Sequence, residues 1–138
     1  MVSGRIKVSI KGKIVSGSRQ AAFFTQLDWV QQQCQEKFGF RPYPGTLNLE
    51  IGDEYLPIIA LLQTKKLVEL IPPDPNFCTA KSIPVSIESI EGAVIIPEEN
   101  VNIHANNIVE VIAPLKLKDA LAVRDGDIIE LVLKIPKE

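Results

Sequence analysis

One stretch of the chain carries its strongest structural signals: Phe38-Gly39-Phe40-Arg41-Pro42-Tyr43-Pro44-Gly45-Thr46-Leu47-Asn48-Leu49. The two prolines fix their own φ and favour extended geometry in their neighbours. Gly45 permits backbone angles that other residues resist. The last four residues alternate polar and apolar, as in a half-buried strand. We therefore expect a rigid turn that leads into a strand, with Leu47 and Leu49 facing the core.

Thr46 and Asn48 lie two residues apart, so the predicted strand presents both side chains on one face. A hydroxyl and a carboxamide oxygen are ligands that Mg²⁺ accepts when substrate phosphates and water complete its coordination. Thr and Asn near a turn also commonly bond the local backbone. The spacing alone leaves both interpretations open.

Size and composition indicate one folded domain over residues 1–138. The chain is 46% hydrophobic and 23% charged, with a formal net charge of −2. It lacks the general basic field that holds a polyanion, so we expect no nucleic-acid partner. The apolar runs are far shorter than a membrane span, and the N-terminus lacks the apolar run of a signal peptide. We expect no membrane association and a cytoplasmic protein.

Strand signals alternate with Gly and Pro punctuation along most of the chain. Residues 5–15 predict a bent first strand, residues 16–22 a loop, and residues 55–62 a short extended segment. Thr25 begins the longer predicted helix, which carries an apolar stripe and ends at Gly39. One or two helical turns are expected over residues 115–121. This pattern predicts a mainly β fold, a small barrel with one longer and one short appended helix.

Three residue types with reactive or ring side chains have ordinary structural interpretations here. The two cysteines, Cys34 and Cys78, lack the spacing of a metal site and are expected to be buried free thiols. Trp29 is expected to pack in or beside the core, with a flavin-lining role as the alternative. His104, the one histidine, falls in a polar loop and is expected to have no special role, although its chemistry also suits a general base or ligand.

The stretch Phe38–Leu49 resembles the signature of the archaeal-type, CTP-dependent riboflavin kinases. Further matches follow in the family's order, and the similarity extends over nearly the whole chain. They are Val15-Ser16-Gly17, Glu91-Gly92-Ala93-Val94-Ile95-Ile96-Pro97, Val109-Glu110-Val111-Ile112-Ala113-Pro114-Leu115-Lys116-Leu117-Lys118 and Val123-Arg124-Asp125-Gly126-Asp127. The resemblance implies a six-stranded cradle-loop β-barrel.

The same resemblance implies an activity and a set of site residues. The activity is transfer of the γ-phosphate of CTP to riboflavin, giving FMN and CDP with Mg²⁺. Thr46 and Asn48 would hold the metal ion, and Asn102 and Glu110 would contact the flavin. The residues that would bind the nucleotide fall in two segments: Gly17, Ser18, Arg19, Gln20, Ala21 and Ala22, and then Leu115, Lys116, Leu117 and Lys118.

The first nucleotide segment departs from the family's glycine-rich pattern, in which closely spaced glycines let backbone N–H groups reach phosphate oxygens. Gly17 is kept, but Arg19 and Ala21 replace the later glycines and Ala22 replaces a basic residue. This departure favours an alternative, a non-catalytic or repurposed member that binds a flavin or nucleotide. The retained Thr46 and Asn48 favour the kinase. A DNA-binding relative is a third hypothesis, suggested by residues 115–132 and opposed by the net acidity.

Overall fold

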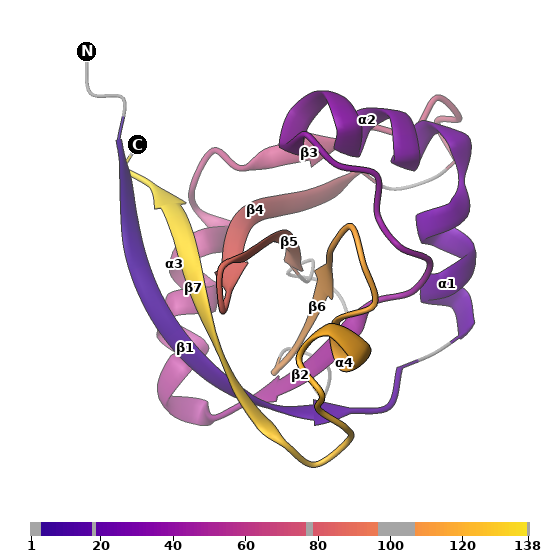
Figure 1. Cartoon of the computed structure of the whole chain (residues 1–138). Coiled ribbons are helices and arrows are strands. Elements are labelled where there is room, and N and C mark those ends of the chain that lie inside the picture. The colour runs from indigo at the N-terminus through magenta and orange to yellow at the C-terminus, as the bar shows by residue number, and fades with distance from the viewer. Residues whose placement is uncertain (1–3, 18, 77–78, 97–106, 138) are drawn as a thin grey trace.

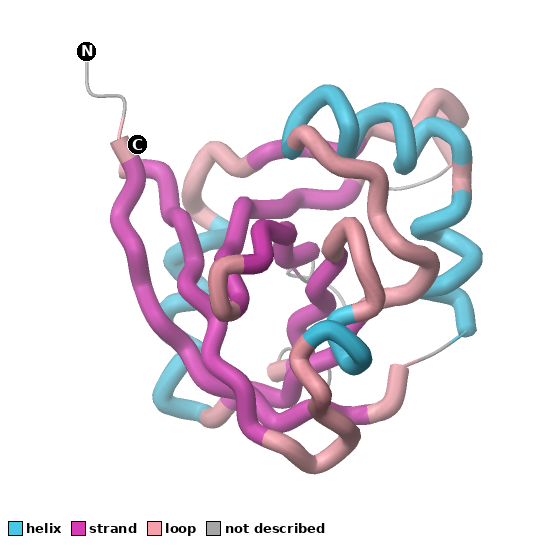
Figure 2. The backbone as a smooth tube through the Cα atoms, in the orientation of Figure 1, coloured by secondary structure: helices cyan, strands magenta, loops and turns pink. Residues whose placement is uncertain are grey.

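The computed structural model describes residues 4–17, 19–76, 79–96 and 107–137. Strands form a ring with helices around its outside, as the tube view shows (Figure 2). The strands are β1 (Arg5–Val15), β2 (Leu47–Ile51), β3 (Val68–Leu70), β4 (Ala80–Ile87), β5 (Ile90–Ile96), β6 (Ile108–Ile112) and β7 (Ile128–Pro136). The helices are α1 (Arg19–Gln26), α2 (Asp28–Phe38), α3 (Leu56–Gln63) and α4 (Leu117–Ala120), with a 3₁₀ turn at Asp53–Tyr55 before α3.

Six of these strands close into an antiparallel barrel. Neighbouring strands follow the order β4-β5-β6-β2-β1-β7, and pairing of β4 with β7 completes the ring (Figure 1). Strand β3 lies outside the ring and pairs with β4. This arrangement confirms the predicted small six-stranded barrel.

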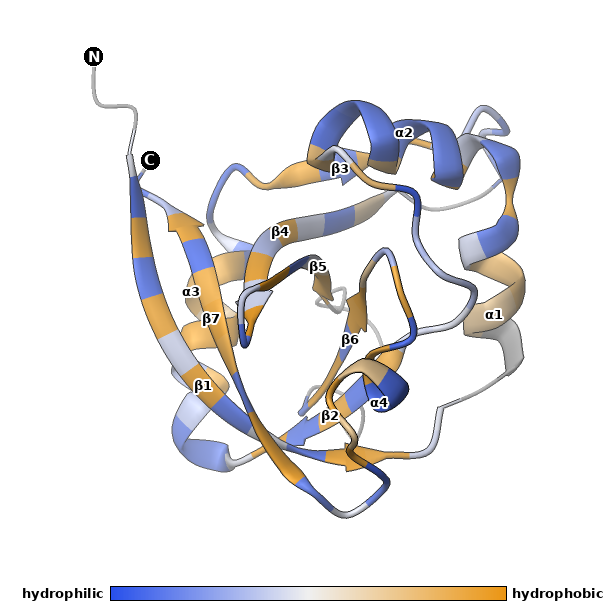
Figure 3. Cartoon of the chain, viewed as in Figure 1, coloured by the Kyte–Doolittle hydropathy of each residue, from blue (hydrophilic) through white to orange (hydrophobic). Residues whose placement is uncertain are grey.

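The barrel core is formed by apolar residues that alternate along the strands. Leu47, Leu49 and Ile51 of β2 are all buried, whereas Glu50 between them is exposed. The same alternation colours the strands in the hydropathy view (Figure 3). The prediction that Leu47 and Leu49 face the core is confirmed, and it fixes the register that places Asn48 on the outer face.

A second, smaller apolar cluster, the outer cluster, joins α2 to the outside of the barrel. Its buried members are Val30, Cys34, Phe40, Leu70, Ala93 and Ile112. Cys34 is a free buried thiol, as predicted, and burial raises its pKa to about 11. Cys78 lies outside the described residues. The outer cluster matters for function because it seats α2 beside the loop that leads into β2.

Three secondary-structure predictions were wrong. The predicted loop over residues 16–22 becomes helix α1 from Arg19 onward, because Arg, Gln and Ala favour helix once the glycines are absent. Thr25 lies in the last turn of α1, and α2 begins separately at Asp28 with no side-chain cap. Residues 56–63 form helix α3, since a short apolar run does not by itself distinguish strand from helix.

Gly39 and Pro84 lie where glycine and proline are expected to end or interrupt an element. Gly39 ends α2 with a φ of 82°, and its N–H donates to the carbonyls of Cys34 and Gln35. Pro84 lies in β4 between the residues that pair with β3 and those that pair with β7. A residue without an N–H is tolerated at this position because β4 pairs with β3 before Pro84 and with β7 after it, so no backbone hydrogen bond on that edge is lost. None of the helices in the described part of the chain has the length and apolar character needed to cross a membrane.

Candidate functional site

The loop before β2 is held by hydrogen bonds from three different elements. Tyr43 donates its N–H to the carbonyl of Ala113 at 2.8 Å, just beyond the end of β6. Gly45 donates its N–H to Thr25 Oγ1 at 2.7 Å, and Gln31 Nε2 donates to the carbonyl of Pro42 at 2.9 Å. Gly45 itself has a φ of 105°, a conformation that favours glycine. These bonds hold the loop, and therefore Thr46 at its end, in a fixed position.

Thr46, Asn48 and Glu110 form a compact group of oxygen atoms on the outer face of β2 and β6. Thr46 Oγ1 donates to Asn48 Oδ1 at 2.7 Å and lies 3.4 Å from Glu110 Oε1. Asn48 and Glu110 are directly opposite each other in the β2–β6 register. The prediction that Glu110 points away from Val109 and Val111 is confirmed, since both valines are buried in the barrel core.

Gly17 covers the carboxamide of Asn48. A Cβ placed on Gly17 would come within 2.3 Å of Asn48 Nδ2 and 3.0 Å of its Cγ. Asn48 is only 7% exposed although it lies on the outer face of the barrel. The segment after β1 therefore closes over the oxygen group, and any side chain at position 17 would displace Asn48.

A pocket with a volume of about 160 Å³ connects this group to the second predicted nucleotide segment. Its walls are the Tyr43–Leu47 stretch, Val111 and Ala113 of the β6 end, and the segment from Leu115 to Lys118. Thr46 belongs both to this pocket and to the oxygen group. Two of the stretches that carry the family resemblance, Phe38–Leu49 and Val109–Lys118, thus meet at this pocket.

Two lysines line the pocket from the residues around α4. Lys116 Nζ lies 4.0 Å from the carboxylate of Asp119, and both side chains are well exposed. Lys118 Nζ lies 2.7 Å from Asp125 Oδ1. The pocket therefore combines apolar walls with two ammonium groups, of which Lys118 has a close carboxylate partner.

The structure brings together many of the predicted site residues. Gly17, Thr46, Asn48 and Glu110 form one contiguous group, and the segment Leu115–Lys118 lies next to it through the pocket. The backbone of Arg19 to Ala22 forms the start of α1. Ser18, Asn102 and His104 lie outside the described residues.

Three residues that shape the site were given no site role in the sequence analysis. Thr25 is fully buried and donates to a carbonyl of Ala21 or Ala22 while it accepts from Gly45. Gln31 belongs to the polar face of α2, yet it reaches the loop before β2. Asp125 binds Lys118 and Ser16. For Thr25 and Gln31, the signal in the sequence is a polar residue on a helix that precedes a proline-rich loop.

The oxygen group consists of atoms of the type that small hard cations accept as ligands. Within the described ranges, no cluster of three or more His, Cys, Asp or Glu residues is present, so a site built from such ligands alone is not found there. Adjacent ligands of an octahedral Mg²⁺ lie about 2.9 Å apart, given bond lengths of about 2.0–2.1 Å. Thr46 Oγ1 and Asn48 Oδ1 are 2.7 Å apart, which is the usual length of the hydrogen bond that joins them and is slightly shorter than the separation of two such ligands.

Comparison with known proteins yields a consistent set of relatives. A family model named for CTP-dependent riboflavin kinases, described as "Domain of unknown function DUF120", matches residues 14–133. A riboflavin kinase of Pyrobaculum arsenaticum is 35% identical over 128 residues, which cover 90% of this chain and 60% of the relative. A riboflavin kinase of Archaeoglobus fulgidus is 37% identical over 127 residues, covering 90% of this chain and 54% of the relative.

A third relative has nearly the same length as this chain. The riboflavin kinase of Methanobrevibacter smithii is 34% identical over 125 residues, which cover 90% of this chain and 98% of the relative. The chain therefore spans about 60% or less of the first two relatives but almost the whole of the third. Both the family model and this full-length match place the chain in the archaeal-type riboflavin kinase family, to which it belongs.

Proposed function

We propose that this protein is a riboflavin kinase that transfers the γ-phosphate of CTP to riboflavin, giving FMN and CDP with Mg²⁺. The observation that carries the proposal is the oxygen group of Thr46, Asn48 and Glu110 beside the pocket of Leu115–Lys118. Phosphoryl transfer depends mostly on positioning and on electrostatic stabilisation, and a site of this kind supplies both.

The side chains of Thr46 and Asn48 are the proposed protein ligands of Mg²⁺. Both oxygens are neutral, so a bound ion would keep its full charge for the phosphate oxygens of the nucleotide. When bound, the ion supplies charge neutralisation on the transferring phosphate. Gly17 supports this role because its lack of a side chain lets its own backbone lie against the carboxamide of Asn48.

The nucleotide is proposed to lie between the start of α1 and the pocket. Lys116 and Lys118 line the pocket and are proposed to face its phosphates as point charges. The apolar part of the pocket, where Tyr43 and Leu115 are partly exposed, suits a planar base.

Riboflavin is proposed to approach from the side of Glu110. This carboxylate is half-buried and lies 3.4 Å from Thr46 Oγ1, so a group that it binds would be held next to the proposed metal ligands. A hydroxyl-rich ribityl chain is a natural partner for a carboxylate that accepts hydrogen bonds.

A binding protein without kinase activity is the second candidate function, favoured by one observation. The segment from Arg19 to Ala22 is helical and lacks the glycines that let a loop wrap around phosphates. In that case the oxygen group and pocket would bind a flavin or nucleotide without turnover. The pairing of Thr46 with Asn48 favours the kinase, since a simple binder has no need for two such ligands.

Formation of FMN tests the choice directly. The protein is incubated with riboflavin, Mg²⁺ and each of CTP, ATP, GTP and UTP in turn, and the flavins are separated by chromatography. We expect FMN to form with CTP and to be lost when Mg²⁺ is removed by a chelator. If no donor gives FMN while riboflavin or a nucleotide still binds in calorimetry, the second candidate replaces the first.

A further inference from the structure

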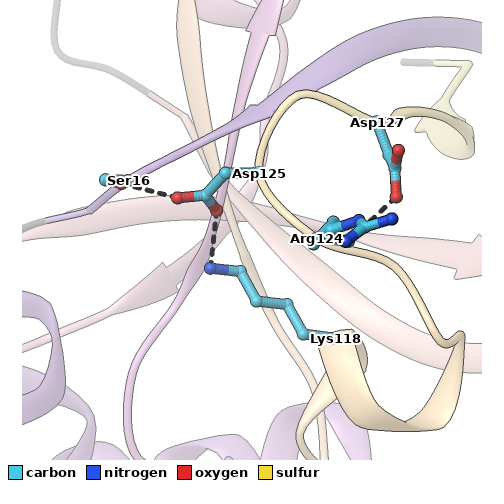
Figure 4. A network of polar contacts seen from close by, with 5 residues as sticks. All are labelled: Ser16, Lys118, Arg124, Asp125 and Asp127. Atoms are coloured by element: carbon cyan, nitrogen blue, oxygen red, sulfur yellow. Dashed lines mark hydrogen bonds and ion pairs between the residues drawn. The ribbon is translucent and has the colours of Figure 1, made fainter.

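The carboxylate of Asp125 connects the two predicted nucleotide segments. Ser16 Oγ donates to Asp125 Oδ2 at 2.7 Å, and Lys118 Nζ donates to Asp125 Oδ1 at 2.7 Å (Figure 4). Ser16 directly precedes Gly17, and Lys118 is the last residue of the Leu115–Lys118 segment. One side chain therefore bonds to both sides of the proposed phosphate site.

The turn that carries Asp125 is itself firmly placed. Gly126 donates its N–H to the carbonyl of Ile14 at 2.8 Å, and Ile14 donates its N–H to the carbonyl of Asp127 at 2.8 Å. Asp127 Oδ2 accepts from the backbone N–H of Arg124 at 2.9 Å, which closes the turn (Figure 4). These bonds hold the turn against the end of β1, so the position of the carboxylate is set by the barrel.

The contact with Asp125 leaves Lys118 able to bind phosphate. An ammonium group has three donors, and only one of them is used by Asp125. The hydrogen bonds from Lys118 and then from Ser16 hold the pKa of Asp125 below its usual range. The carboxylate is thus ionised at neutral pH and orients the ammonium group of Lys118.

We propose that Asp125 is a positioning residue of the nucleotide site, which fixes Lys118 and, through Ser16, the Gly17 segment above Asn48. This inference rests on the proposed function, because it assigns both segments to a nucleotide. The contacts form a continuous line from Lys118 through Asp125, Ser16 and Gly17 to the oxygen group.

If Asp125 served only to stabilise the fold, its replacement would lower the thermal midpoint of unfolding. The side chains of Lys118 and Asp125 are 38% and 47% exposed, and ion pairs with this exposure contribute little to the stability of a protein. Replacement of Asp125 is therefore expected to leave the thermal midpoint nearly unchanged. Its effect should fall on nucleotide binding.

The experiment compares Asp125→Ala and Asp125→Asn with the wild type. Calorimetric titration with each of the four nucleoside triphosphates and Mg²⁺ gives the dissociation constants, and FMN formation gives kcat and KM. We expect Asp125→Ala to raise the Kd and KM for the nucleotide by about tenfold, the effect of losing two hydrogen bonds. The kcat and the KM for riboflavin should change by less than about twofold. Asp125→Asn should restore most of the affinity, because an amide can accept from Lys118 and donate to Ser16.

Two further variants make the test specific. Glu130→Ala removes an exposed carboxylate from β7, and we expect it to behave as the wild type. The double variant Ser16→Ala with Asp125→Ala should bind nucleotide no more weakly than Asp125→Ala alone, since both changes break the same bond.

The outcomes separate this inference from the kinase proposal. Nucleotide binding that is weakened by Asp125→Ala without FMN formation in any sample supports the positioning role and contradicts the kinase. Unchanged or tighter nucleotide binding by Asp125→Ala overturns the positioning role, even if FMN forms. Absence of nucleotide binding by the wild type overturns both.

Discussion

At the scale of single residues, the site depends on a glycine as much as on any polar side chain. A Cβ at position 17 would meet Asn48 Nδ2 at 2.3 Å, and Asn48 is almost completely buried. The atom in the way belongs to a side chain, so the carboxamide can shift while the backbone stays in place. A methyl group at Gly17 should therefore damage the proposed metal site more than the fold.

We predict that Gly17→Ala reduces FMN formation by about tenfold or more, because Asn48 Oδ1 leaves its place next to Thr46 Oγ1. The free energy of unfolding in urea should fall by less than about 1 kcal/mol. Gly4→Ala is the matched control, since a Cβ there would meet only the flexible side chain of Lys137 at 3.4 Å. Equal activity of Gly17→Ala and the wild type would show that the position of Asn48 is unimportant.

The sequence predicted the placement of Thr46 and Asn48, but it did not predict the residues that support them. The alternation of Thr46, Leu47, Asn48 and Leu49 predicts that the two polar side chains share one face, and the hydrogen bond between them confirms it. The contacts of Thr25 and Asp125 could not be predicted, because they join residues that lie 20 and 109 positions apart. No local pattern encodes a pairing across such distances.

At the scale of elements, helix α1 supports the proline-rich loop through one buried hydroxyl. Thr25 Oγ1 accepts the N–H of Gly45 at 2.7 Å and donates to the carbonyl of Ala21 or Ala22 at 3.0 or 3.1 Å. Thr25 is fully buried, so water cannot replace these bonds. The loop and the helix are therefore expected to be stable only together.

We predict that Thr25→Val lowers the free energy of unfolding by about 1–3 kcal/mol, because it leaves the N–H of Gly45 without its acceptor. Thr25→Ser keeps the hydroxyl and should lose less stability. Urea denaturation followed by the fluorescence of Trp29 measures both, since Trp29 of α2 packs edge-on against Phe24 of α1, the helix that contains Thr25. Identical unfolding midpoints for the Val and Ser variants would refute this role of the hydroxyl.

Prediction of the elements succeeded for the strands and failed where composition was ambiguous. The alternating strands β1, β2 and β7 were predictable because each has one face in the barrel core. The segment Leu56–Gln63 is apolar on most sides, so its helix was read as an extended segment. Helix α1 was predicted as a loop because the family has glycines there, whereas Arg19 to Ala22 are good helix formers.

At the scale of the whole molecule, the closed barrel acts as a rigid frame that brings distant segments to one place. The end of β1, the loop before β2, the middle of β6 and the α4 region come from four parts of the chain. They converge on the oxygen group and the adjacent pocket (Figure 1). A scaffold of paired strands holds such a site with little movement, which is what positioning of a phosphate requires.

The proposed kinase activity depends on Thr46 and Asn48 binding a cation that a triphosphate shares. The most direct test is FMN formation from riboflavin and CTP by the wild type and by Asn48→Ala, measured over a range of Mg²⁺ concentrations. Asn76→Ala, a change in an exposed loop, serves as the control. We predict that the wild type and the control form FMN equally well and that Asn48→Ala loses roughly a hundredfold or more of the activity. Formation of FMN by Asn48→Ala at the wild-type rate and with the same Mg²⁺ dependence would contradict the claim.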